Sequence, residues 1–147
     1  MLFKVFKYML PSISLFMLEE SPKPGNAESS EPQSAIFAGG CFWCTEAAYL
    51  DISGVIKVES GYSGGKVKNP TYEQVSTGLT AHYESVRVTY NPEKITYEDL
   101  LEYYWRVIDP TDDGGQFYDR GSQYRTVIFY RNESEKKIAS ESKAALE

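Results

Sequence analysis

The sequence predicts an α+β fold in two layers, a β-sheet with helices packed on one face. Three observations lead to this prediction. Stretches of alternating apolar and polar residues are typical of strands, stretches with apolar residues three or four positions apart are typical of helices, and the two kinds follow one another along the chain. The chain has 147 residues, of which 41% are hydrophobic. That length and composition suit one domain with its own apolar core.

The first strand and the first helix are predicted on either side of a double glycine. Residues 35–38 are apolar and end at Gly39-Gly40, which is typical of a short buried strand. Residues 41–52 then show the spacing of a helix. Its apolar stripe is expected to consist of Trp43, Ala47 and Leu50.

Two further strands are predicted from alternation, at residues 55–62 and, after a long connection, at residues 83–90. In the later stretch, the residues expected to face the core are Val86, Val88 and Tyr90. In the earlier stretch, one face is expected to carry Ile56, Val58, Ser60 and Tyr62.

The last part of the chain contains a helix, a strand and a second helix. Thr96 is predicted to cap the first helix, with Asp99 completing the capping box. Its apolar stripe is expected to be Tyr97, Leu100, Leu101, Tyr104 and Ile108. Residues 124–130 form a strongly β-prone strand, and Asn132 or Ser134 opens a polar helix that runs to the C-terminus. Two βαβ units in this order predict a ferredoxin-like α+β sandwich with an added C-terminal helix.

Charge and cysteine content exclude several classes of protein. The 15 Lys and Arg residues against 21 Asp and Glu residues give a net charge of −6. This balance argues against a nucleic-acid binder, which presents positive charge to phosphates. No apolar run reaches the roughly 18 residues of a membrane-spanning helix. Two cysteines do not make a disulfide framework, and with one histidine they do not complete a structural zinc site.

The chain is predicted to divide into an N-terminal extension, residues 1–34, and a domain, residues 35–147. The extension opens with two lysines ahead of an apolar stretch, residues 8–18, which resembles a signal peptide and favours export over a cytoplasmic location. No small-x-small cleavage site follows, so an upstream start or a frayed terminus is the alternative. Residues 19–34 are rich in Pro, Ser and Glu and predict a disordered linker.

The strongest chemical signal is the sequence Gly-Gly-Cys-Phe-Trp-Cys at residues 39–44. The glycines allow a sharp turn after a strand, and Cys41 is then expected on the first turn of a helix. Free N–H groups and the helix dipole favour negative charge there, so Cys41 is a candidate nucleophilic thiolate. Cys44 lies three residues further on the same face, where it could form a disulfide with an oxidised Cys41. Two buried, inert cysteines are the alternative.

Four short motifs follow one another in a distinctive order: Gly40–Trp43, Gly61–Gly65, Asn69–Tyr72 and Gly121–Arg125. In this order, from about Ile36 onward, the chain resembles the peptide methionine sulfoxide reductase A family. The resemblance implies an enzyme that reduces the S epimer of methionine sulfoxide, free or in proteins, and so repairs oxidised proteins. It implies no metal or bound organic cofactor, because thiols carry the two electrons. Thioredoxin or a similar dithiol is the implied reductant, and a monomer is expected.

The resemblance assigns roles to five residues around the sulfoxide. Cys41 corresponds to the nucleophile that attacks the sulfur. Phe42 and Trp43 correspond to the aromatic pair that packs around the substrate's S-methyl group. Tyr62 and Tyr124 correspond to two tyrosines whose hydroxyls hydrogen-bond the sulfoxide oxygen, which becomes more basic as the sulfur is attacked.

The resemblance places two further residues at the site, and one of them departs from the family pattern. Asp119 corresponds to an acidic residue nearby. Gln74 stands where the family's proton-donating Glu is expected, and an amide does not deliver a proton as a carboxylic acid does. The proton is then expected from Tyr62, Tyr124, a water held by Asp119, or the neighbouring Glu73.

Two other departures concern how the enzyme would be recycled. Cys44 replaces the glycine that is commonest after Cys-Phe-Trp, and is the candidate resolving cysteine. The family usually continues beyond Glu147 with a Tyr-His-Gln segment and often a recycling cysteine, so the domain is expected to lack that C-terminal part.

Two alternative functions stay open on the sequence. One is a thioredoxin-like dithiol–disulfide oxidoreductase that uses Cys41 and Cys44. The other is a protein that binds methionine-containing segments without catalysis. His82, the only histidine, is interpreted as structural and not as a base for Cys41, because no partner Asp or Asn is evident nearby in the sequence.

Overall fold

The computed structural model describes residues 30–146, and a four-stranded antiparallel sheet forms its centre. The strands are β1 (Gln33–Gly39), β2 (Val55–Ser63), β3 (Tyr83–Tyr90) and β6 (Thr126–Phe129). They lie side by side in the order β2-β3-β1-β6. The predicted α+β class is confirmed, and each of the four main strands overlaps a stretch in which the sequence predicts one.

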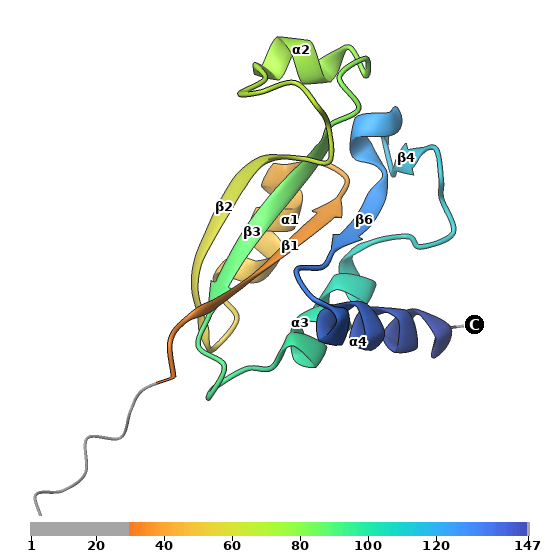
Figure 1. Ribbon diagram of the computed structural model, residues 1–147. Coiled ribbons are helices and arrows are strands. Elements are labelled where there is room, and N and C mark those ends of the chain that lie inside the picture. The colour runs from red at the N-terminus through yellow and green to blue at the C-terminus, as the bar shows by residue number, and fades with distance from the viewer. Residues whose placement is uncertain (1–29, 147) are drawn as a thin grey trace, which may run out of the picture.

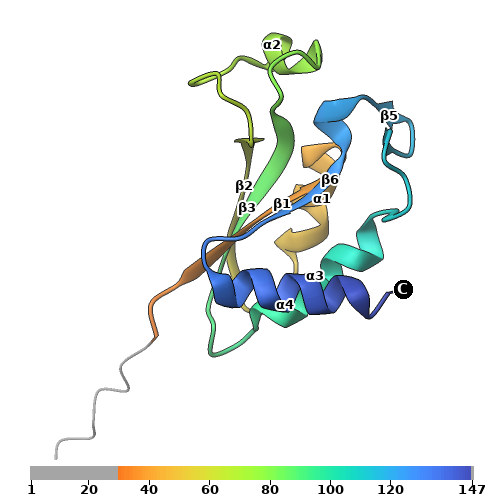
Figure 2. The same cartoon turned by 45° about the vertical axis from the view of Figure 1, so that its right-hand side comes forward.

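Four α-helices and a small ribbon complete the described chain. The helices are α1 (Phe42–Leu50), α2 (Tyr72–Ser76), α3 (Tyr97–Val107) and α4 (Glu133–Ala144). The ribbon pairs β4 (Gly115–Gln116) with β5 (Asp119–Arg120). Figure 1 shows α1 and α3 behind the sheet and α4 beside α3, and Figure 2 shows the sheet nearly edge-on with α1 and α3 on one side. In both views α2 and the ribbon lie at the end of the molecule where β1 ends.

The strand register separates an inner face of the sheet from an outer one. Val86 of β3 lies opposite Phe37 of β1 and Ser60 of β2. Because side chains alternate, Val86 and Val88 share the face covered by α1 and α3, and both are fully buried. Arg87, between them, points to the outer face and is exposed.

A cluster of aromatic rings joins the sheet to the helices. Phe37 is fully buried, and its ring stacks on Tyr49 of α1 (centroid distance 5.7 Å) and on Tyr104 of α3 (5.3 Å). Both tyrosine hydroxyls find partners in the core: Tyr49 donates to the carbonyl of Leu100 (3.0 Å), and Tyr104 donates to the carbonyl of Ala38 (2.7 Å). The phenol groups therefore pack as apolar rings without leaving these hydroxyls unpaired.

Phe37→Ala is expected to lower the free energy of unfolding by about 3–5 kcal/mol, because it removes the ring on which both helices pack and leaves a cavity. Urea unfolding followed by circular dichroism measures this change. Tyr130→Ala, at a half-exposed aromatic ring, serves as the control and should change stability by less than about 1 kcal/mol. A loss at Phe37 as small as that of the control would contradict the role given to the ring.

Helix α3 follows its sequence prediction. The Thr96 side chain accepts from Asp99 N–H and the Asp99 carboxylate accepts from Thr96 N–H, which forms the expected capping box. All five predicted stripe residues are buried. The prediction is accurate here because the apolar residues of this helix lie on one side only.

Two expectations about packing are wrong. The stripe predicted for α1 is exposed at Trp43 and Leu50, and the buried face instead carries Phe42, Thr45 and Tyr49. The apolar residues of this helix lie on several of its sides, so their spacing does not identify the side that faces the core. Ile56 does not share the face of Val58, because a β-bulge shifts the register between Val55 and Lys57 and leaves Ile56 57% exposed.

The predicted signal-like segment lies outside the described residues. The first strand begins at Gln33, two residues before the expected one, so it takes in the end of the predicted linker. Within residues 30–146, no helix has the length and apolar character needed to cross a membrane.

Candidate active site

Cys41 lies between the end of β1 and the start of α1. Gly40, just before it, has φ +91°, and a Cβ there would lie 2.7 Å from the Gln116 side chain, so both backbone and space require glycine. Cys41 is the N-cap of α1 and not, as expected, part of its first turn. Its carbonyl accepts from the N–H groups of Cys44 and Thr45, both at 3.1 Å. The cysteine side chain thus stands at the positive end of the helix, where an anion is stabilised.

The Cys44 thiol faces Cys41. Partial burial raises the pKa of Cys44, and the charge of Cys41, a hydrogen bond between the two side chains and the charge of Asp119 raise it further. The Cys44 thiol therefore stays protonated and is placed to donate to the sulfur of Cys41. Both cysteines are free, and Cys44 is the more exposed of the two.

Four aromatic rings lie beside the cysteine pair. Phe42 is buried, and its ring centroid lies 5.7 Å from that of Trp43 and 5.6 Å from that of Tyr62. Trp43 is 66% exposed, and its outer ring stacks almost in parallel on Tyr72 of α2, at 6.5 Å. An exposed tryptophan held between other rings leaves an apolar surface open at the mouth of the site.

A buried carboxyl group lies directly under this surface. Glu84 of β3 is only 3% exposed, and its carboxylate accepts from the backbone N–H of Phe42 at 3.0 Å. Burial raises the pKa of Glu84; the bond from Phe42 opposes this effect, and the negative charge of Asp119 adds to it. The net shift favours the neutral acid, which is able to give up a proton.

Two tyrosine hydroxyls share the environment of Glu84. Burial raises the pKa of Tyr62, and the charges of Glu84 and Tyr72 raise it further. Burial likewise raises the pKa of Tyr124, with contributions from Glu84 and Tyr72, then from Asp119 and Cys41. Both hydroxyls therefore stay protonated and act as hydrogen-bond donors. Tyr124 ends a short 3₁₀ turn (Ser122–Tyr124), so the expected strand begins two residues after it.

Gln74, expected at the substrate, takes part in the cap of α2. The residue is the third of α2, and its side-chain oxygen accepts from Thr71 N–H at 2.9 Å, while its own N–H donates to the Thr71 hydroxyl. These bonds form a capping box, which explains why an amide is suitable at this position. Gln74 is exposed, and the carboxyl group beside Cys41 comes instead from Glu84.

Sequence reasoning therefore brings together most of the site but misses Tyr72 and Glu84. Tyr72 belongs to the Asn-Pro-Thr-Tyr motif, yet its contact with Trp43 depends on the path of a long connection. The sequence around Glu84, in contrast, contains a pattern that could have identified this residue. The alternation of residues 83–90 places it on the same inward face as Val86, and a carboxyl group on a core face is rare without a function or a partner.

His82 has a structural role, as the sequence analysis favoured. The N–H of Gly65 donates to its Nδ1 at 3.2 Å, so its Nε2 carries the hydrogen and donates to the carbonyl of Val67 at 2.9 Å. Both ring nitrogens are used, and the buried imidazole tethers the connection after β2 to the start of β3. It is not available as a base for Cys41.

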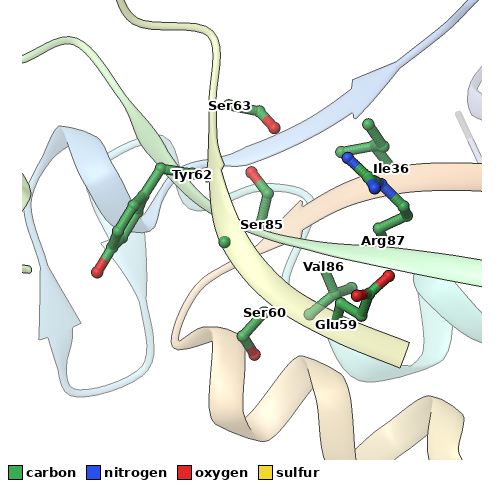
Figure 3. A pocket seen from close by; sticks show the side chains of 9 residues that line it. Ile36, Glu59, Ser60, Tyr62, Ser63, Ser85, Val86 and Arg87 are labelled. Atoms are coloured by element: carbon green, nitrogen blue, oxygen red, sulfur yellow. The ribbon is translucent and has the colours of Figure 1, made fainter. Parts of the chain in front are cut away.

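A separate hollow of about 260 Å³ lies over β2 and β3 and is not the cysteine site. Its lining includes Ile36, Glu59, Ser85 and Arg87, and Figure 3 shows the Tyr62 side chain directed away from these residues. The hollow is open and polar, and no cysteine lines it. The chemistry is therefore concentrated around Cys41.

Comparison with known proteins identifies a family for this chain. The family model described as "Peptide methionine sulfoxide reductase" matches residues 33–147. The MsrA protein of Limosilactobacillus reuteri is 57% identical over 114 residues, which cover 78% of this chain and 65% of that protein. The MsrA of Bacillus licheniformis is 55% identical over 112 residues, covering 76% and 62% respectively. The chain thus spans less than two thirds of the length of these two relatives.

Solved structures give the same result. Mxr1 of Saccharomyces cerevisiae in reduced form matches with a TM-score of 0.74 and 30% identity, over 78% of this chain and 68% of that one. Methionine sulfoxide reductase A of Corynebacterium diphtheriae matches with a TM-score of 0.72 and 28% identity, over 86% of this chain and 65% of that one. The sequence and the fold lead to one conclusion: this chain belongs to the peptide methionine sulfoxide reductase family.

Proposed function

We propose that this chain reduces methionine-S-sulfoxide, in proteins or free, to methionine. The observation that carries the proposal is the meeting of Cys41, at a helix N-terminus, with the buried acid Glu84 under an open aromatic surface. A nucleophile, a proton donor and an apolar box are the groups that sulfoxide reduction needs.

In the first step the Cys41 thiolate attacks the sulfoxide sulfur. Glu84 in its neutral form gives its proton to the sulfoxide oxygen, and the hydroxyls of Tyr62 and Tyr124 donate hydrogen bonds to the same atom. The bond between methionine sulfur and oxygen breaks, the transient bond between the two sulfurs breaks with its electron pair leaving on methionine, and the oxygen with its proton passes to the Cys41 sulfur. Methionine leaves with its sulfur reduced by two electrons, and Cys41 becomes a sulfenic acid. The negative charge of Asp119 supports this proton transfer because it raises the pKa of Glu84.

The aromatic box selects the substrate. Phe42 and Trp43 would hold the S-methyl group, because sulfur and its attached methyl group make favourable contacts with ring faces and edges. With the methyl group on the rings and the oxygen directed to Glu84, only one sulfoxide epimer presents its sulfur to Cys41. This geometric requirement supports specificity for a single epimer, and the family resemblance indicates that it is the S epimer.

In the second step Cys44 resolves the sulfenic acid. Its sulfur attacks that of Cys41, water leaves, and a Cys41–Cys44 disulfide forms. The N-cap position of Cys41 supports this step, because an N-cap side chain does not have to follow helical geometry. Thioredoxin or a similar dithiol would then return the disulfide to two thiols.

The structural framework of the proposal is a ferredoxin-like domain at residues 35–147. The strand order β6-β1-β3-β2, with α1 after β1 and α3 after β3, supports that description. A monomer is proposed as the working unit.

One assay tests the proposal against its alternatives. The purified protein with dithiothreitol is offered the separate S and R epimers of a blocked methionine sulfoxide. Turnover of the S epimer alone supports the proposal. Reduction of insulin disulfides without sulfoxide turnover would identify a dithiol exchanger instead, and substrate binding without either reaction would identify a binding protein.

Trp43→Ala is expected to lower kcat/KM for the S epimer by about tenfold, because a sulfur–aromatic contact contributes up to about 1.5 kcal/mol. Steady-state kinetics measure this loss. Since Trp43 is largely exposed, the free energy of unfolding should fall by less than about 1 kcal/mol. Global unfolding with residual activity intact would instead mean that the ring is an ordinary packing residue.

Cys44→Ser is expected to keep the first turnover, which releases one methionine per protein, and to slow cycling with thioredoxin by about tenfold or more. Mass spectrometry after one equivalent of sulfoxide should show the loss of two hydrogens in the wild type and a trappable sulfenic acid in the variant. Full thioredoxin-linked cycling in the variant would show that the sulfenic acid is reduced directly.

A further inference from the structure

An exposed aromatic pair stands at the tip of the β4–β5 ribbon. Phe117 is 68% exposed and Tyr118 is fully exposed, and they form the turn between the two strands. In Figures 1 and 2 this ribbon lies to the right of the end of β1, apart from α2, which lies above it. Aromatic residues concentrated on an accessible surface are typical of sites where proteins bind other proteins.

The ribbon holds the pair in a fixed position. Arg120 forms two hydrogen bonds with the Asp112 carboxylate, at 2.5 and 2.9 Å. Gln116 accepts from Asp109 N–H at 2.7 Å and donates to the Asp109 carbonyl at 2.8 Å. A Cβ on Gly115 would lie 2.2 Å from a backbone oxygen, so the ribbon closes tightly. The exposure of the aromatic pair therefore belongs to the folded structure and is not the result of a frayed loop.

Phe117, one member of the aromatic pair, adjoins the resolving cysteine. A cavity of about 60 Å³ is lined by Cys41, Cys44 and Phe117, together with Gly39, Thr45, Val107, Gln116 and Asp119. None of the rings of the substrate box lines this cavity. Cys41 thus lines a cavity to which Phe117 contributes and the rings of the substrate box do not.

We propose that Phe117 and Tyr118 are the docking surface for a protein dithiol of the thioredoxin class, which attacks Cys44 and not Cys41. The inference rests on the proposed function and names the site where its reductant binds. A protein reductant needs an apolar surface beside an accessible sulfur, and Cys44 is the exposed member of the pair. The aromatic box proposed for the methionine side chain does not line the cavity beside Phe117.

The direction of attack follows from the leaving group. The reductant's thiolate attacks the Cys44 sulfur, the Cys41–Cys44 bond breaks, and the electron pair leaves on Cys41. The N-terminus of α1 stabilises that anion, whereas Cys44 lies one turn further from the helix end. The reductant's second thiol then attacks the mixed disulfide, releases Cys44, which takes up a proton, and departs as a disulfide.

Trapping identifies the sulfur that is attacked. The Cys41–Cys44 disulfide is prepared with diamide, so the experiment does not depend on sulfoxide reduction, and is mixed with a bacterial thioredoxin whose second active-site cysteine is replaced by serine. Peptide mapping by mass spectrometry should find thioredoxin on Cys44. An adduct on Cys41, or the failure of diamide to remove two hydrogens, would overturn the inference.

Kinetics test the surface itself. Stopped-flow reduction of the same disulfide by wild-type thioredoxin should slow by about tenfold in Tyr118→Ser and in Phe117→Asn, while reduction by dithiothreitol stays within about twofold. Asparagine is chosen because it tolerates the positive φ of Phe117 (+52°). Tyr118→Phe should restore the thioredoxin rate. Tyr130→Ser, at a half-exposed aromatic residue of another surface, is the matched control. Equal loss with both reductants, or no loss with thioredoxin, would overturn the assignment.

Discussion

Replacing Cys41 with serine should abolish sulfoxide reduction, with a loss of at least about 10³-fold in single-turnover rate. A serine hydroxyl is a far weaker nucleophile and does not take up the oxygen as a sulfenic acid does. Methionine release after rapid mixing with the S epimer, quantified by chromatography, measures the loss.

The Cys41→Ser protein should remain folded. The Cys41 side chain makes no capping hydrogen bond, and the bonds at the start of α1 use its backbone carbonyl, which serine keeps. Circular dichroism and thermal unfolding provide the control. Near-native turnover by this variant would remove Cys41 from the mechanism.

Glu84→Gln should lower the single-turnover rate by about 10²–10⁴-fold, the usual contribution of general acid catalysis. Glutamine keeps the size of the side chain and accepts the hydrogen bond from Phe42, but it does not supply a proton. Gln74→Ala is the matched control: it should weaken only the cap of α2 and leave the rate within about threefold. A variant pair with the opposite order of effects would remove Glu84 from the acid role and assign Gln74 a part in the mechanism.

The raised pKa of Glu84 sets the sign of two pH effects. The wild-type rate should fall as pH rises through that pKa, because the acid form is lost, whereas Glu84→Gln should lack this step. The contribution of Glu84 to the free energy of unfolding changes with pH in the same direction as the rate. A carboxyl group whose pKa is raised by folding contributes its full stability below the unfolded value near 4.3, and that stability is lost as pH rises through the folded value. At neutral pH the glutamine variant should therefore be at least as stable as the wild type, which separates loss of activity from loss of fold.

Sequence patterns predict the fold well where one face of an element is apolar. The cap and the buried stripe of α3 follow from Thr96 and the spacing after it, and the inward residues of β3 follow from alternation. The patterns do not predict α1, because its residues are apolar on several sides. Which side meets the core depends on Tyr49 stacking against Phe37, a contact between two elements.

A site residue is predictable from the sequence when the features that give it its chemical role are its neighbours in the chain. Cys41 is identified by the glycines before it and by the helix after it. Gln74 and Glu84 show where prediction from the sequence stops. The position of Gln74 after the Asn-Pro-Thr-Tyr motif suggested a site residue, but its side chain caps α2. The buried acid, Glu84, lies on a strand and contacts Phe42, which is 42 residues away in the sequence. Only the three-dimensional arrangement decides between them.

The position of Cys41 as an N-cap has a consequence for the whole catalytic cycle. The backbone of this residue holds the first turn of α1 through its carbonyl, while its side chain takes no part in the helix. In the proposed cycle its sulfur is thiolate, sulfenic acid and disulfide in turn, and the side chain makes no capping hydrogen bond that these changes would break. The changes of oxidation state in this cycle therefore fall on the side chain of the N-cap residue, outside the hydrogen bonds that hold the first turn of α1.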